Sequence, residues 1–223
     1  MPRGDLAAIE RVVDANTAAV IVEPVQGVAG AVDLGAPFLR ALESRARAVG
    51  ALVVLDEVQC GMGRTGRPFA ANLHGLSPDM ITTAKALGAG FPCSALLMAD
   101  RVASRLRTDD LGTTFGGGPM ACALVEAVVD IIEGEGLLEN VRARATQIRE
   151  TCVTGPVTSV QGAGLLCGLR TARPAKDVQR ELLERGILAG TSADPNVVRI
   201  LAPYVLESSH VEQLADVLAS LPS

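Results

Sequence analysis

Short apolar runs alternate with helix-like segments through the first hundred residues. The runs are Ala18–Val22, Ala51–Leu55, Met80–Ala84 and Cys93–Ala99, and the stretch from about Ala36 to Val49 has a helical pattern. Strand, helix, strand connections at this spacing predict right-handed crossovers and a parallel sheet. Apolar residues make up 48% of the chain but aromatic residues only 2%, so the core is built from Ala, Val, Leu and Ile. That composition is typical of a parallel sheet with helices on both faces.

The pattern changes at about Met120, where longer helices begin. Asp5 is expected to cap an earlier helix that runs to about Asn16. The later part predicts helices at Met120–Glu133, Leu137–Thr151, Ala175–Arg185 and Ser209–Leu221, two short strands around Gly162 and Gly164, and a strand at Val197–Leu201. We therefore expect an α/β fold with a larger domain over 1–119, a long connecting helix over 120–151 and a smaller α/β domain over 152–223.

Charge and residue usage exclude several classes of protein. The net charge is -5 without a basic cluster, which argues against a nucleic-acid surface. No apolar run approaches the roughly 18 residues of a membrane helix, and the beginning, MPRGDLAAIE, lacks an apolar signal core. Five cysteines without a CxxC, and the isolated His74 and His210, predict neither disulfides nor a metal site. We expect a cytoplasmic protein.

Charged residues stand where three of the apolar runs end, at Glu23, Asp56 and Lys85. Ligands of open parallel sheets collect at the carboxyl ends of the strands. Asp56 and Lys85 are 29 residues apart, close to the roughly 30 residues of one βαβ unit, so both are expected at one edge. A buried ion pair is one interpretation. The other is a pyridoxal phosphate (PLP) site, in which a lysine forms a Schiff base and a carboxylate pairs with the ring nitrogen.

Two glycine-rich stretches are candidates for binding phosphate. Gly61–Gly66 matches GxGxxG, but Arg67-Pro68 after it does not open a helix, which disfavours a dinucleotide site. The stretch Thr113–Pro119 offers hydroxyls and backbone N–H groups just before the long helix, and an ordinary helix entry is the alternative.

Four motifs in order are distinctive: EPVQGVAG (23–30), LDEVQCGMGRTG (55–66), TTAKALGAGFP (82–92) and GTTFGGGPMAC (112–122). Together they resemble the class III PLP-dependent aminotransferases, particularly the acetylornithine and ornithine aminotransferase branch. The resemblance covers essentially the whole chain. It implies part of a fold-type I large domain, with a mostly parallel sheet, followed by a smaller C-terminal α/β domain.

The resemblance also assigns roles to single residues. Lys85 of TTAK would carry the cofactor covalently, and Asp56 of DEVQ would pair with the pyridine nitrogen. Val58 would pack on the ring, and Gln59 would approach the ring hydroxyl.

Two further residues are implied to bind phosphate and substrate. Thr114 would reach the cofactor phosphate of a neighbouring protomer, which implies a homodimer with shared sites. Arg199 would receive a substrate carboxylate, for which the guanidinium geometry is suited. A structural ion pair is the alternative for Arg199.

The chain departs from the family pattern at several places. Val28 stands where ornithine-type members carry a glutamate that masks the carboxylate-binding arginine, Leu111 replaces a common histidine, and Gly118 replaces the asparagine of FGGNP. Family members also have an N-terminal portion of comparable size before the part matched here. We therefore expect a fragment, a misplaced start codon or half of a split enzyme.

The expected reaction is transfer of an amino group from an amine such as N-acetylornithine or ornithine to 2-oxoglutarate. The alternatives are a catalytically incomplete chain that acts as a dimer partner, or a related PLP-dependent decarboxylase or aminomutase.

Overall fold

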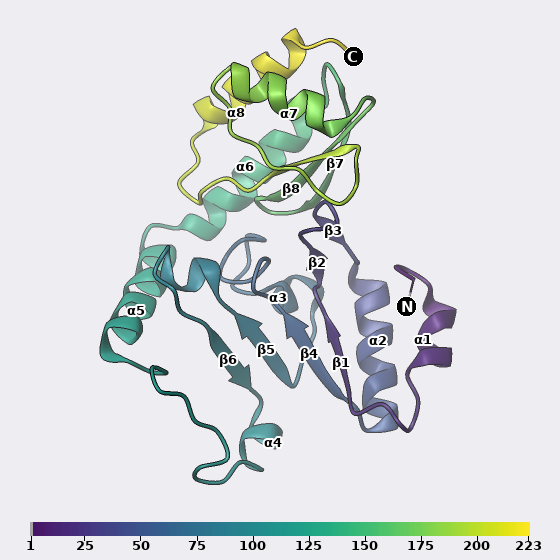
Figure 1. Cartoon of the computed structure of the whole chain (residues 1–223), viewed down its shortest axis with the longest axis vertical. Coiled ribbons are helices and arrows are strands. Elements are labelled where there is room, and N and C mark those ends of the chain that lie inside the picture. Colours follow the sequence, from purple (N-terminus) through teal and green to yellow (C-terminus); the bar gives the residue numbers. More distant parts are fainter. Residues whose placement is uncertain (1) are drawn as a thin grey trace. The chain divides into compact units, whose positions relative to one another are not determined.

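The computed structural model describes residues 2–223 and divides into two compact units. The first unit comprises the chain up to Pro24, Leu34–Met62 and Phe69–Gly134, and the second comprises Val25–Asp33, Gly63–Pro68 and Glu135–Ser223. Figure 1 follows the chain through both units. These units are defined by backbone contacts, and the assignment of 1–119, 120–151 and 152–223 to three functional parts stays a prediction.

The first unit is built on a four-stranded sheet in the order β1-β4-β5-β6. The strands are β1 (Ala19–Val22), β4 (Leu52–Asp56), β5 (Met80–Thr83) and β6 (Ala95–Met98). β1 pairs with β4 and β4 with β5 in parallel, as the alternation of strand and helix predicts. Asp56, the last residue of β4, is opposite Thr82 of β5.

The last strand of this sheet runs in the opposite direction. β6 pairs antiparallel with β5, with Ile81 opposite Leu97. The segment between them contains only a 3-10 turn, η1 (Lys85–Gly88), which is too short for the crossover that parallel strands need. The expectation of a parallel arrangement was therefore wrong for this strand.

Helices α1 (Leu6–Val12) and α2 (Ala36–Val49) lie beside β1 in Figure 1. The Asp5 cap is confirmed, because its Oδ1 accepts the Ala8 N–H at 2.9 Å. The helix ends earlier than predicted because the Asp14 side chain accepts the Asn16 N–H at 2.9 Å, which forms a turn.

The core of the first unit covers one face of its sheet. Leu55 of β4 packs with Ala46 of α2 and Ala71 of α3 (Ala70–His74). The unit is completed by α4 (Asp100–Ala103) and α5 (Pro119–Gly134).

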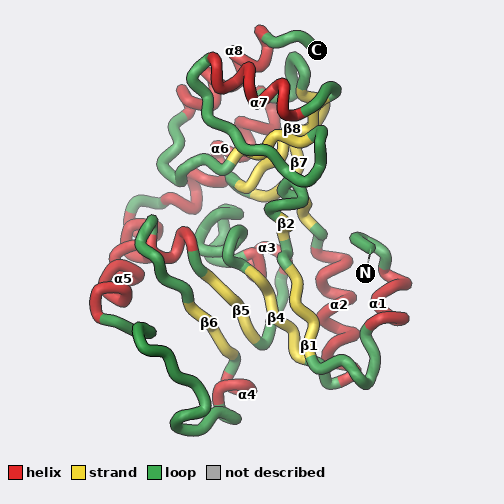
Figure 2. The backbone as a smooth tube through the Cα atoms, viewed as in Figure 1, coloured by secondary structure: helices red, strands yellow, loops and turns green. Residues whose placement is uncertain are grey.

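The second unit packs helices on a small antiparallel sheet, in the order β7-β8-β9. Its strands are β7 (Val157–Ala163), β8 (Leu166–Thr171) and β9 (Val197–Ile200), and its helices are α6 (Leu137–Thr151), α7 (Ala175–Glu184) and α8 (Ser208–Ser220). A hairpin of β2 (Val25–Gln26) and β3 (Val32–Asp33), which the sequence did not predict, also belongs to it. Figure 2 shows the helices and strands of this unit by colour. Its core combines buried leucines with valine, isoleucine, alanine and cysteine side chains.

Among residues 2–223, none of the helices combines the length and the apolar character needed to cross a membrane.

Candidate active site

Asp56 ends β4 with its carboxylate held by two donors. Its Oδ1 accepts the backbone N–H of Val58 at 3.1 Å and the hydroxyl of Thr82 at 3.2 Å. The side chain is half-buried. Within residues 2–223, Oδ2 receives no hydrogen bond, so one oxygen of the carboxylate stays available to a donor from a ligand.

Lys85 lies two residues beyond the end of β5, the strand next to β4. Asp56 and Lys85 therefore lie at the carboxyl ends of neighbouring parallel strands, at the same edge of the sheet, as their spacing predicts. Lys85 begins η1 with a φ of 49°, in the left-handed backbone region that residues other than glycine rarely adopt. Lys85 is exposed, and its amine makes no hydrogen bond or ion pair within the described part of the chain. The buried ion pair that was an alternative for Asp56 and Lys85 is not formed.

Glu57, next to Asp56, is fully buried and points into the protein. Its carboxylate accepts the N–H groups of Ala70 at 2.5 Å and Ala71 at 2.8 Å, and so caps the beginning of α3. Burial raises the pKa of the Glu57 carboxyl, and the two N–H groups and His74 oppose that rise. Glu57 therefore anchors the turn that follows Asp56, a role that the sequence analysis missed.

Val58 and Gln59 form the turn after β4, and both side chains are half-buried. Gln59 makes no side-chain hydrogen bond to the described residues. Thr114 lies in the exposed loop before α5 and also has no hydrogen-bond partner within residues 2–223. A cavity of about 560 Å³ adjoins that loop and is lined by Cys93, Thr113 and Gly116 among others. The cofactor roles expected for Val58, Gln59 and Thr114 stay predictions.

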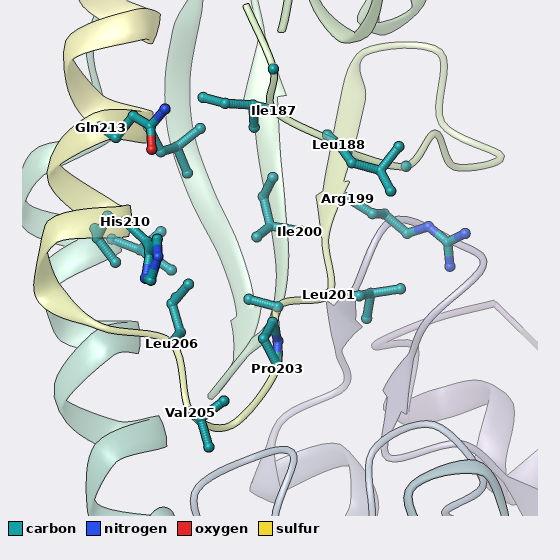
Figure 3. A pocket seen from close by; sticks show the side chains of 17 residues that line it. Ile187, Leu188, Arg199, Ile200, Leu201, Pro203, Val205, Leu206, His210 and Gln213 are labelled. Carbon is teal, nitrogen blue, oxygen red and sulfur yellow. The ribbon is translucent and has the colours of Figure 1, made fainter. Parts of the chain in front are cut away.

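Arg199 belongs to β9 in the second unit. Its Nε donates to the Thr191 carbonyl oxygen at 2.6 Å, and its Nη1 donates to the Gly27 carbonyl oxygen at 3.3 Å. Figure 3 shows the guanidinium directed away from Ile200 and Leu206, which line an apolar cavity of about 680 Å³. The ion-pair alternative is not formed, because Arg199 has no acidic partner within residues 2–223. Two backbone carbonyl groups hold the Arg199 guanidinium in place without neutralising its positive charge.

Val28, the notable departure from the family pattern, lies next to Gly27 in the β2–β3 turn. Its side chain is 58% exposed, and its carbonyl oxygen accepts the Ala193 N–H at 2.9 Å. No carboxylate competes for the Arg199 guanidinium at this turn.

The later part of the GxGxxG stretch, Gly63–Gly66, belongs to the second unit and packs against other residues of that unit. The Arg64 carbonyl oxygen accepts the Leu165 N–H at 2.9 Å, and the Arg64 guanidinium lies 4.5 Å from the centre of the Tyr204 ring. The next helix, α3, begins only at Ala70 and has five residues. The stretch therefore lacks the helix N-terminus of a dinucleotide site.

The described residues hold no cluster of three or more His, Cys, Asp or Glu side chains that could bind a metal ion. His74 is buried and ends α3, whereas His210 is exposed at the beginning of α8.

Comparison with known proteins decides the family. The profile of the family described as Aminotransferase class-III matches residues 3–221. The chain belongs to the class III aminotransferase family. An acetylornithine aminotransferase from Streptomyces coelicolor is 42% identical over 227 residues, which cover 100% of this chain and 56% of the relative. One from Archaeoglobus fulgidus is 39% identical over 95% of this chain and 56% of the relative.

A solved structure shares the fold. The ornithine aminotransferase from Toxoplasma gondii, described with partial occupancy of PLP at its active site, matches with a TM-score of 0.89 and 29% identity. The match covers 98% of this chain and 54% of that structure. The predicted fold class, part of a fold-type I aminotransferase, is confirmed. The chain spans about 56% of the length of these two curated relatives.

Proposed function

We propose that the protein transfers an amino group from an N-acetylornithine-like or ornithine-like amine to 2-oxoglutarate, with PLP as cofactor. The observation that carries this proposal is the placement of Asp56 and Lys85 at one edge of the sheet. The names of the Streptomyces and Archaeoglobus relatives support the acetylornithine branch.

The free atoms at the sheet edge fit PLP. Lys85 is exposed and its amine has no partner among residues 2–223, which suits attachment to an aldehyde. Asp56 has one carboxylate oxygen that no donor in the described part of the chain reaches, and a protonated ring nitrogen would supply that donor. An amine and an acceptor are the two groups that hold this cofactor.

Each residue then has a defined task. Lys85 would hold the cofactor through Nζ, and the same nitrogen would carry a proton to or from the reacting carbon. Asp56 would hold the ring nitrogen in its protonated form. When bound, PLP withdraws electrons from the carbon that bears the amino group.

Arg199 is proposed to bind a substrate carboxylate. Its guanidinium is oriented by the carbonyl oxygens of Thr191 and Gly27, and among the described residues it has no acidic partner to displace. Replacing it by lysine removes the planar fork, so Arg199→Lys should raise KM for 2-oxoglutarate about tenfold or more. Arg185→Lys, at the exposed end of α7, is the matched control and should leave KM unchanged.

Chemical trapping tests attachment of the cofactor directly. The chain contains two lysines, Lys85 and the exposed Lys176 of α7. Incubation with PLP, borohydride reduction and peptide mass spectrometry should place the adduct on Lys85. The absorption band of the bound cofactor should disappear in Lys85→Ala and persist in Lys176→Ala.

Equal labelling of the two lysines, or labelling of neither, would contradict a dedicated site in this chain. Labelling of neither lysine would favour the non-catalytic dimer partner. Analysis of products from glutamate and candidate amines separates amino transfer from decarboxylation and from amino-group migration.

We also propose a homodimer in which Thr114 approaches the partner's cofactor phosphate. A mixture of Lys85→Ala and Thr114→Val chains should then form hybrid dimers with one intact site. Activity above that of either variant alone is expected, and its absence in verified hybrids would contradict shared sites.

A further inference from the structure

Two hydrogen bonds converge on one oxygen of Asp56. The Val58 N–H and the Thr82 hydroxyl both donate to Oδ1, at 3.1 and 3.2 Å, and no donor within residues 2–223 reaches Oδ2. The two donors come from different places, one from the turn after β4 and the other from β5. Together they fix the rotation of the carboxylate about its Cβ–Cγ bond.

Thr82 is held in place by the sheet itself. It is opposite Asp56 in the parallel ladder, and its carbonyl oxygen accepts the Glu57 N–H at 3.0 Å. Because threonine is branched at Cβ, few rotamers are open to its side chain. The hydroxyl therefore reaches Asp56 from a rigid position.

We propose that Thr82 is a positioning residue that orients Asp56 so that Oδ2 faces the ligand. This inference rests on the proposed function, because the ligand is the cofactor whose protonated ring nitrogen Oδ2 would accept. A carboxylate that is already oriented loses less rotational freedom when a cationic donor binds. The Val58 N–H alone would leave the carboxylate with one anchor.

Thr83 provides a matched control on the same strand. It is next to Thr82 but is buried, and its hydroxyl has no hydrogen-bond partner within the described residues. Thr82→Val and Thr83→Val remove the same group from adjacent positions, and Thr82→Ser keeps the hydroxyl at the first position. Loss of an unpaired buried hydroxyl is close to neutral for stability, so Thr83→Val should fold normally.

The experiment uses the full chain and two measurements. Titration with PLP, followed by absorbance, should give a Kd about tenfold higher for Thr82→Val, as expected from loss of one hydrogen bond that supports a charged acceptor. Thr82→Ser should restore most of the affinity, and Thr83→Val should match the wild type. Crystal structures without cofactor should show the Asp56 carboxylate turned or in several orientations in Thr82→Val alone.

Unchanged affinity together with an unchanged carboxylate in Thr82→Val would overturn the proposal. Equal loss of affinity in Thr82→Val and Thr83→Val would also overturn it, because the effect would then be a general disturbance of β5. Failure of the proposed function is distinguishable, because it appears as absence of a Lys85 adduct in the wild type. In that case the cofactor-free crystal structures still decide whether Thr82 orients Asp56.

Discussion

The two units differ in how completely they bury their apolar side chains. In the second unit, Leu165, Leu169 and Leu182 are fully buried at the centre of one core. In the first unit, Ile21 of β1 is 72% exposed and Leu97 of β6 is 44% exposed. Helix α5 has sixteen residues, of which only Ile132 is buried. The unit with the candidate cofactor residues is therefore the one with the less complete core.

This difference separates the part of the molecule that contributes most apolar burial from the part that carries the candidate cofactor residues. Burial of apolar surface contributes about 25 cal/mol per Å², so the core of the second unit contributes stability that the exposed strands of the first do not. Asp56 and Lys85 of the candidate site lie instead at the ends of neighbouring strands, and Asp56 is held by hydrogen bonds from the Val58 N–H and the Thr82 hydroxyl. We expect equivalent substitutions in the two units to differ in their effect on the free energy of unfolding.

The largest difference is expected for glycine substitutions. Gly164 in the second unit has a φ of 55°, and an added Cβ would overlap the backbone of Arg64 and Thr65. Gly117 in the first unit has a φ of 67° and open space around it. Gly164→Ala should cost more than about 3 kcal/mol, whereas Gly117→Ala should cost about 1 kcal/mol for its backbone conformation alone. Urea unfolding of both variants measures the difference, and similar losses would contradict it.

The next difference is expected for leucine truncation. Leu169→Ala should lower the free energy of unfolding by about 3 kcal/mol, because it removes a fully buried side chain and leaves a cavity. Leu97→Ala, on the exposed strand β6, should cost less than about 1 kcal/mol. The measurement is chemical denaturation of the full chain followed by circular dichroism. A larger loss for Leu97→Ala would show that the first unit depends on apolar packing as much as the second.

The sequence predicts where the candidate site lies better than it predicts which residues hold the site residues in place. Asp56 and Lys85 could be chosen because a charged residue at the end of an apolar run marks the edge of a parallel sheet. The direction of β6 was not predictable from the apolar run Cys93–Ala99, because strand direction depends on the length of the connection that precedes the strand. The β2–β3 hairpin was missed because its strands have two residues each, too few for an apolar pattern.

The supporting residues depend on register, which a single sequence does not reveal. Thr82 meets Asp56 only because the two are paired across the ladder, and either threonine of TTAK has the same chemistry in the sequence. Glu57 follows Asp56 directly, yet the alternation of side chains in an extended segment turns it toward α3. The one feature of the sequence that could have indicated this role is that a second carboxylate, Glu57, directly follows the residue that ends β4.

The smallest expected effect is a pH dependence with opposite signs in the two units. Burial raises the pKa of Glu57 above its ordinary value of 4.5. The folded protein therefore binds the Glu57 proton more tightly than the unfolded chain, and this contribution to stability is lost as the pH rises from 4.5 through the folded pKa. The free energy of unfolding of the wild type minus that of Glu57→Gln should fall over this range.

Glu181 of α7 should behave in the reverse way. Its carboxylate accepts two hydrogen bonds from Arg173, at 2.9 and 2.6 Å, and this pairing lowers the pKa of the Glu181 carboxyl below 4.5. Its contribution is present above pH 4.5 and is lost as the pH falls through the folded pKa. The free energy of unfolding of the wild type minus that of Glu181→Gln should therefore fall as the pH is lowered. The change should be smaller than the effect of Leu169→Ala, because the Arg173–Glu181 pair is partly solvated.

Urea unfolding of Glu57→Gln, Glu181→Gln and the wild type between pH 3.5 and 8 tests the two signs. Slopes of the same sign would show that burial does not dominate at Glu57, and that the buried cap resembles a surface ion pair in its energetics.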